Sequence, residues 1–144
     1  MTGRARSSRG HRALPHTADV IMEAWGPDLA SCLEEAVAAL VGACADVTGA
    51  PVVGTHVVHL PRAPADAVLV DLLDEVVFVL DTAGTVPIGA DIRAAAGGGL
   101  DVTLSLAALR SVEPTGAVPK AISRSDLRVE TRPGEVRCAF LVDV

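Results

Sequence analysis

The sequence predicts an α+β fold in which two helices pack on a mostly antiparallel β-sheet in two layers. Two segments, residues 29–44 and 65–80, carry apolar residues at helical spacing. The last third of the chain instead contains segments typical of β-strands, separated by turns rich in glycine and proline. Helices that precede a run of strands joined as hairpins favour segregated α and β elements over an alternating parallel fold.

The first predicted elements are an extended segment and a helix. Residues 13–25 read as extended chain that is interrupted at 16–19 by residues that prefer turns. Gly26 and Pro27 then turn the chain, and Asp28 is placed to cap a helix because its carboxylate can accept the free N–H groups of the first turn. The helix predicted over 29–44 follows directly.

A short β-branched strand at 55–60 precedes the second helix. The segment 65–80 is too long for a strand and lacks internal glycine and proline, so a helix is the better interpretation. Most of its surface is apolar, which indicates deep packing. The exception is one stripe with Phe78 and three acidic residues, namely Asp71, Asp74 and Glu75.

Four strands complete the predicted sheet. Strands at 88–96 and 100–109 are joined by the glycine triplet 97–99, in which glycine supplies the positive φ angles of a tight hairpin. A loop rich in proline and glycine follows. Strands at 121–130 and 135–144 then form the last hairpin.

Length and composition indicate one domain with a short arm. A chain of 144 residues is the usual size of one domain, which we assign to residues 13–144. Residues 1–12 hold four arginines among serine and glycine and are typical of a disordered basic arm. No segment resembles a signal peptide or reaches the ~18 apolar residues of a membrane span, so we expect a soluble cytoplasmic protein. Three scattered cysteines are interpreted as buried side chains in a reducing compartment.

Charge and missing motifs exclude several functions. A net charge of −6 and only 2% aromatic residues argue against direct binding of nucleic acid. The chain has no P-loop lysine motif, no Gly-x-Ser-x-Gly elbow and no His-Glu-x-x-His motif. His56 and His59 are three residues apart on a strand and would face opposite sides, so a shared metal ion is not expected.

The candidate site combines carboxylates from the two ends of the predicted domain. Asp19 lies where the first extended segment bends, and Asp143 directly precedes Val144, whose α-carboxylate is a further negative group. If strand pairing brings Asp19 beside them, an all-oxygen set would suit Ca²⁺, Mg²⁺ or Mn²⁺. Two other readings stay open: Asp19 could cap a turn, and the terminus could be solvated. Asp74 and Glu75 could likewise form an acid/base or metal site or a solvated face.

At these residues the chain resembles the archease family. The resemblance is colinear from His16 to Val144 and rests on five motifs, including the final Asp followed by an aliphatic residue. The other four are His16-Thr17-Ala18-Asp19, Trp25-Gly26-Pro27-Asp28-Leu29, Leu69-Val70-Asp71-Leu72-Leu73-Asp74-Glu75 and Pro119-Lys120-Ala121-Ile122-Ser123.

The chain departs from the family pattern in two places. Ser123-Arg124-Ser125 stands where the family usually has Thr-Tyr-His. Leu72 and Asp74 stand where the second helix usually carries Trp and Asn. The missing histidine could weaken coupling to a partner or mark adaptation to a different partner surface.

The resemblance implies an accessory protein and not an enzyme. Archeases assist the GTP-dependent RNA ligase of tRNA splicing by promoting guanylylation of the ligase and its multiple turnover. RNA would then be reached only through the ligase, with no membrane partner. The implied metal ligands are Asp19, Asp143 and the terminal carboxylate of Val144, with Ca²⁺ as the ion expected in a crystal and Mg²⁺ or Mn²⁺ as alternatives. The candidate contacts to the partner or to phosphate are His16, Lys120, Asp74 and Glu75.

Two alternatives belong to other functional classes. A small metal-dependent phosphodiester hydrolase would use Asp19, Asp143 and one of Asp74 or Glu75 as its catalytic carboxylates. A chaperone-like binding module would carry the same acidic residues merely as surface. Metal-dependent turnover would distinguish the first, and absence of cation binding the second.

Overall fold

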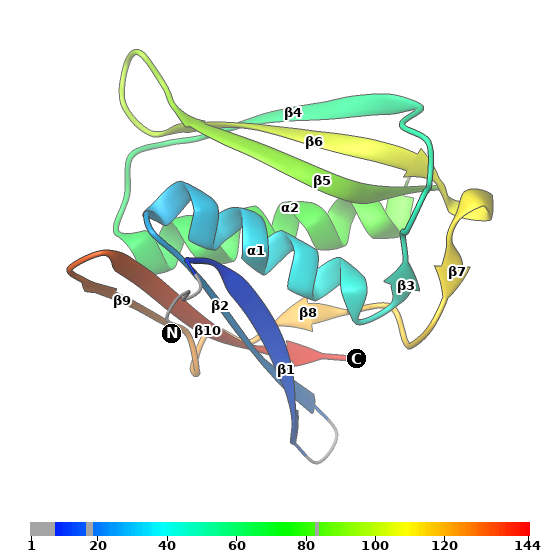
Figure 1. The fold of residues 1–144 in the computed structure, drawn as a ribbon, viewed down its shortest axis with the longest axis horizontal. Coiled ribbons are helices and arrows are strands. Elements are labelled where there is room, and N and C mark those ends of the chain that lie inside the picture. The colour runs from blue at the N-terminus through cyan, green and yellow to red at the C-terminus, as the bar shows by residue number, and fades with distance from the viewer. Residues whose placement is uncertain (1–7, 17–18, 83) are drawn as a thin grey trace.

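The computed structural model describes residues 8–16, 19–82 and 84–144. Two helices lie between two antiparallel sheets, and each helix contacts strands of both sheets (Figure 1). The predicted class, two helices with mostly antiparallel strands, is confirmed. The arrangement of layers differs from the expected two layers, because the strands are divided between separate sheets and the helices are covered on both sides.

The five-stranded sheet joins the two ends of the described chain. Its order is β1-β2-β10-β8, with β9 also paired to β10, and every pairing is antiparallel. Strand β2 pairs with β10 although more than a hundred residues separate them, so segments far apart in the sequence lie side by side (Figure 1). The strands are β1 (Gly10–His16), β2 (Asp19–Gly26), β8 (Ala121–Ile122), β9 (Arg128–Arg132) and β10 (Glu135–Asp143).

A three-stranded sheet covers the other side of the helices in the order β4-β6-β5. The β5–β6 hairpin turns through the predicted glycines, where Gly99 has φ of 75° and an added Cβ would lie 2.3 Å from the carbonyl oxygen of Leu60. Only glycine fits there. The strands are β4 (Gly54–Leu60), β5 (Thr85–Ala94) and β6 (Leu100–Ala108), followed by the 3₁₀ turn η1 (Leu109–Ser111); β3 (Ala45–Asp46) pairs with β7 (Glu113–Pro114).

Both predicted helices form, and the predicted cap is confirmed. Helix α1 (Leu29–Gly42) begins after Asp28, whose Oδ1 accepts the Ser31 backbone N–H at 2.9 Å. Hydrogen bonds from the Ser31 hydroxyl and N–H lower the pKa of Asp28, because they stabilise the carboxylate. Helix α2 (Ala65–Thr82) ends two residues beyond the predicted end. Among the helices that the structure describes, none is both long and apolar enough to span a membrane.

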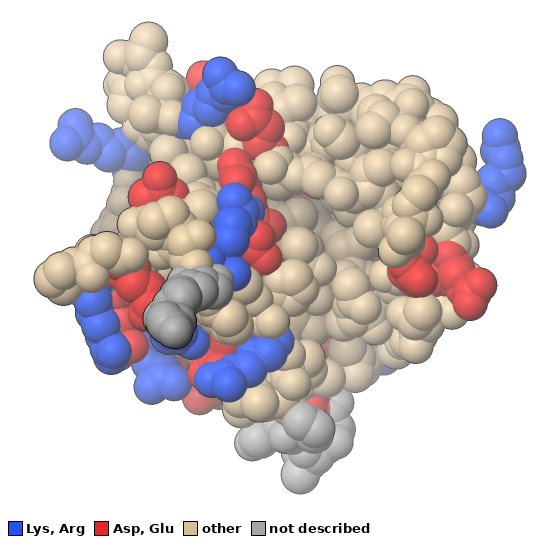
Figure 2. Space-filling view, viewed as in Figure 1, with Lys and Arg blue, Asp and Glu red and all other residues tan. Residues whose placement is uncertain are grey.

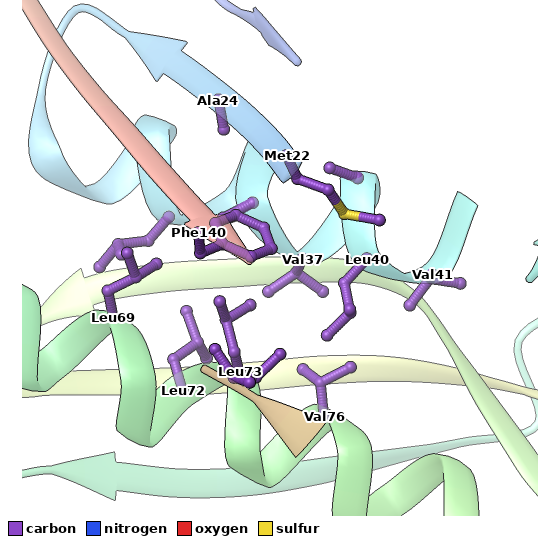
Figure 3. Close-up of a cluster of buried hydrophobic side chains, with 14 of the residues drawn as sticks. Met22, Ala24, Val37, Leu40, Val41, Leu69, Leu72, Leu73, Val76 and Phe140 are labelled. Carbon is purple, nitrogen blue, oxygen red and sulfur yellow. The ribbon is translucent and has the colours of Figure 1, made fainter. Parts of the chain in front are cut away.

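The core lies between the helices and the inner faces of the sheets. Figure 3 shows Phe140 of β10 and Met22 of β2 packed against side chains from both helices. Aliphatic side chains fill most of this space, as the scarcity of aromatic residues predicts. The largest fully buried side chains are Phe140, Met22, Leu33, Leu40, Leu69, Leu72, Leu73, Leu104, Val37, Val76, Val86 and Val102.

The predicted basic arm differs from the structure where it meets the domain. Strand β1 begins at Gly10, so residues 10–12 belong to the sheet and not to the arm assigned to 1–12. Acidic partners hold this segment: Arg12 forms an ion pair with Glu23 of β2, and Arg9 with Glu34 and Glu35 of α1. Residues 1–7 lie outside the described residues.

The strand predicted over 121–130 is wrong, because the chain leaves the sheet at 123–127 between β8 and β9. The Ser123 hydroxyl accepts the backbone N–H of Ser125 at 3.3 Å and contacts its hydroxyl at 2.9 Å. Arg124 forms an ion pair with Asp74 of α2 at 2.8 Å. Local serine hydrogen bonds of this kind compete with strand pairing.

Substitution of Phe140 by alanine should lower the free energy of unfolding by about 3–5 kcal/mol, because it removes a fully buried ring and leaves a cavity. Urea denaturation followed by circular dichroism measures the loss. The same substitution at Phe78, which is 57% exposed, is the matched control and should change stability by no more than about 0.5 kcal/mol. Equal losses in the two variants would contradict the described core.

Candidate functional site

Asp19 and Asp143 are direct partners in the pairing of β2 with β10. Residues opposite each other in an antiparallel pair share one face of the sheet, so the two carboxylates lie on the same side. Alternation along the strands turns Met22 and Val142 toward the helices and both aspartates toward the outer face. Asp143 is exposed and Asp19 partly exposed. The structure therefore brings the two predicted carboxylates together at one end of the sheet.

The segments next to this pair contain three further candidate residues, Lys120, Val144 and His16. The backbone N–H of Lys120 donates to the carbonyl oxygen of Asp143 at 2.8 Å, and Ala121 is the β8 partner of Asp143. Val144 follows, with its side chain packed against the core. His16 is the backbone partner of Asp19 in the β1–β2 pairing, but its side chain lies outside the described part of the chain, as do residues 17 and 18.

The two carboxylates stand at directly opposite positions of the paired strands. Within residues 8–16, 19–82 and 84–144, neither Asp19 nor Asp143 takes part in an ion pair. Like charges directly opposite each other on a sheet destabilise it. A divalent cation between the two carboxylates would remove that repulsion, and oxygen donors suit Ca²⁺, Mg²⁺ or Mn²⁺.

Two side-chain carboxylates do not complete a coordination sphere. Among the described residues, no group of three or more His, Cys, Asp or Glu side chains is placed to hold a metal ion. Additional oxygens would have to come from backbone, from water, or from the α-carboxylate that Val144 carries when the chain ends there. The donor chemistry fits a hard divalent ion with an open, solvated sphere.

The acidic stripe of α2 does not join this site. Asp74 pairs with Arg124, and the Glu75 carboxylate contacts His56 Nε2 of β4 at 2.6 Å. These residues form separate contacts to the two layers that enclose α2, and not a shared carboxylate cluster. His59 contacts Asp101 at 2.9 Å on the other side of β4, so the prediction that His56 and His59 face opposite sides is confirmed.

A groove lies beside the carboxylate pair, and the sequence did not predict it. The groove has a volume of about 380 Å³ on the outer face of the sheet. Ile21 and Leu141, which line it, are strand partners two residues from Asp19 and Asp143. The other lining residues are Ala139 and, from the β8–β9 region, Ser125, Asp126 and Arg128. The available signal was Ile21, an apolar residue between Asp19 and Glu23 on the outer face of the strand, but its significance depends on the register.

Charge is distributed unevenly over the face seen in Figure 2. Basic and acidic side chains intermingle on the left of the view, where β1, β9 and the start of α1 lie, while the right is mostly uncharged (Figure 2). The mixture agrees with the ion pairs that Arg9 and Arg12 make. On this face, no continuous basic patch of the kind that binds a phosphate backbone is visible among the described residues.

The fold and the family model together define the class of this protein. Residues 11–144 match the model of the archease protein family (MTH1598/TM1083), and the chain belongs to this family. Curated proteins from Mycobacterium tuberculosis strains H37Rv and CDC 1551, each named "Probable protein archease", are 38% identical over 142 residues. The match covers 99% of this chain and 79% of each relative.

Two solved structures share the fold. The solution structure of Methanobacterium thermoautotrophicum protein 1598 aligns with a TM-score of 0.74 and 20% identity, and the alignment covers 94% of this chain and 99% of that one. The crystal structure of a Thermotoga maritima protein, described as an archease and possible chaperone, aligns with a TM-score of 0.66 and 20% identity over 92% and 96% of the two chains. At this identity the similarity concerns the fold.

In metal-free buffer, Asp143→Asn should raise the free energy of unfolding by about 0.2–1 kcal/mol, because it removes one of two like charges directly opposite each other. The gain should shrink at high salt, which screens exposed charges. Urea denaturation with a chelator present measures both effects. Asp71→Asn, at an exposed site on α2, is the control and should change stability by no more than about 0.5 kcal/mol. If Asp143→Asn were less stable than the unmodified protein, the expected repulsion between the carboxylates of Asp19 and Asp143 would be contradicted.

Proposed function

We propose that this protein is a non-enzymatic accessory protein of a GTP-dependent RNA ligase and holds a divalent cation on Asp19 and Asp143. Membership of the archease family supports the accessory role. The observation that carries the metal site is the direct pairing of the two aspartates at an exposed strand end. The proposed consequence is faster guanylylation of the ligase and repeated turnover in RNA joining.

The strands give these carboxylates a fixed position. Eight consecutive residue pairs join β2 to β10, and their inner side chains are fully buried at Met22 and Phe140. Ligands on strands that are anchored in this way keep their geometry better than ligands on loops. Asp19 and Asp143 would therefore present a cation at a defined point of the surface.

The remaining donors would come from the adjacent backbone and terminus. Val144 is bonded directly to Asp143, and the packing of its side chain against the core restricts its backbone. The α-carboxylate of Val144 is our proposed third ligand in a chain that ends at this residue. Lys120, whose backbone N–H donates to the carbonyl oxygen of Asp143, would contact a phosphate of the partner from the same sheet end.

The bound ion would supply positive charge to the phosphate oxygens during nucleotidyl transfer. The chain's own part is to hold that charge at an exposed edge where a second protein can approach. Direct binding of RNA is disfavoured by the net charge of −6 and by the lack of aromatic platforms. We therefore propose that contact with RNA passes through the ligase.

Calorimetric titration with Ca²⁺, Mg²⁺ and Mn²⁺ should detect cation binding to the unmodified protein. Asp19→Asn and Asp143→Asn should each weaken binding about tenfold or more, because loss of a direct ligand costs at least as much as loss of its supporting contacts. Asp71→Asn should bind as the unmodified protein does. Unchanged binding in both site variants would disprove the metal site, and absence of binding by every form would favour a chaperone-like module.

Addition of the protein should accelerate guanylylation of a GTP-dependent RNA ligase, measured by transfer of labelled guanylate to the ligase. Asp143→Asn should abolish the acceleration, and a short extension after Val144 should reduce it by displacing the α-carboxylate. Full activity of the extended protein would exclude Val144 as a ligand but leave the aspartate pair intact.

The hydrolase alternative is tested in parallel with phosphodiesters and nucleotides in Mg²⁺ or Mn²⁺. Metal-dependent turnover that is lost in Asp19→Ala would overturn the accessory role. We expect no turnover, because Asp74 and Glu75, the additional carboxylates that a hydrolase would require, pair with Arg124 and His56 elsewhere on the molecule.

A further inference from the structure

Two buried cysteines connect α1 with the central strand β10. Cys32 lies in the first turn of α1 and is 0% exposed, and Cys138 lies in β10 and is 1% exposed. Both are free thiols. We propose that Cys32 and Cys138 are a redox modification site that closes to an intramolecular disulfide on reaction with a peroxide. This inference is independent of the proposed function.

Hydrogen bonding and register place the two thiols next to each other. Cys32 Sγ donates to the carbonyl oxygen of Ala24 at 3.5 Å, and Ala24 is the β2 partner of Cys138. Partners in an antiparallel pair have Cβ atoms about 4.5–5.5 Å apart on one face. The Cys32 sulfur therefore lies over the β2–β10 pair at the level of Cys138, on the helix side of the sheet. Both thiols thus lie in the interface between α1 and the sheet, where a disulfide would join the helix to the strand.

The two thiols have pKa values shifted in opposite directions, which gives them different roles in the reaction. The Cys138 thiol lowers the pKa of Cys32 by hydrogen bonding to it, although burial opposes this effect. The Cys32 contact and then burial raise the pKa of Cys138. The thiolate is the nucleophilic form of cysteine, so Cys32 is the group that reacts first and Cys138 the group that resolves the product.

The reaction balances with peroxide as the named oxidant. The Cys32 thiolate attacks one peroxide oxygen, the O–O bond breaks, and the departing hydroxide takes up the thiol proton as water, which leaves a sulfenic acid on Cys32. The Cys138 sulfur then attacks the Cys32 sulfur, the S–O bond breaks, and hydroxide leaves with the Cys138 proton as a second water. Two thiols lose two electrons in total, and one peroxide is reduced to two waters.

Access to the pair requires only a local opening. Cys32 follows directly on the capped start of α1, where Leu29 and Ala30 are partly exposed. The first turn of a helix has N–H groups without helical partners, and helix ends open at lower free energy than the core. Separation of this turn from β2 would expose Cys32 to a small oxidant while the sheet stays paired.

Oxidation of the folded protein by hydrogen peroxide, followed by alkylation and peptide mapping, tests the proposal. The expected product is one peptide pair joined through Cys32 and Cys138, lighter by two hydrogens than the two thiol peptides. Cys44 is the internal control, because it is also buried, burial raises its pKa, and its Sγ donates to the carbonyl oxygen of Val41 at 3.4 Å. Cys44 should stay reduced, and Cys44→Ala should form the same link.

Thermal unfolding provides a second readout. A disulfide between α1 and β10 closes a long loop and should raise the melting temperature by roughly 5–15 °C, reversed by dithiothreitol. Cys138→Ala should show neither the link nor the reversible shift. If the Cys138→Ala variant does not fold, peptide mapping of the oxidised unmodified protein tests the proposal alone. Three free thiols after oxidation, a sulfinic acid on Cys32 without a link, or a link through Cys44 would each overturn it.

Discussion

The antiparallel pairing of β2 with β10 is the constraint on which both the core and the candidate site depend. It sets Met22 opposite Phe140 on the helix side and Asp19 opposite Asp143 on the outer side. Since strand side chains alternate between faces, a slip of one residue in β10 would turn Phe140 toward water and Asp143 toward the helices. The burial of one aromatic ring therefore determines where the carboxylates point, and core packing and site geometry cannot vary independently.

Features that depend on neighbouring residues were predictable from the sequence, and features that depend on distant partners were not. The Asp28 cap, both helices and the glycine turn of the β5–β6 hairpin follow from local backbone chemistry. The approach of Asp19 to Asp143 could be stated only as a condition, because periodicity gives the faces of a strand but not its partner or register. The groove beside them depends on both the register and the β8–β9 loop.

The incorrectly predicted strand at 121–130 is interrupted by local hydrogen bonds between Ser123 and Ser125 and by an ion pair to α2. Arg124 and Asp74, two of the residues interpreted from the sequence as departures from the archease pattern, form an ion pair with each other at 2.8 Å. Both side chains are well exposed, so the pair contributes at most about 1 kcal/mol. Its effect is on position, because it directs the 123–127 segment toward α2 while Ser125 and Asp126 line the groove.

Placement of the carboxylate pair at the end of the strands limits the cost of its repulsion. Asp143 is exposed, so water screens its charge, whereas the same pair at the level of Met22 and Phe140 would lie over the buried centre of the sheet. The pairs from Val20–Val142 to Gly26–Val136 hold the register without any contribution from the aspartates. The sheet can therefore carry two like charges at this position, because the fold does not rely on their mutual contact.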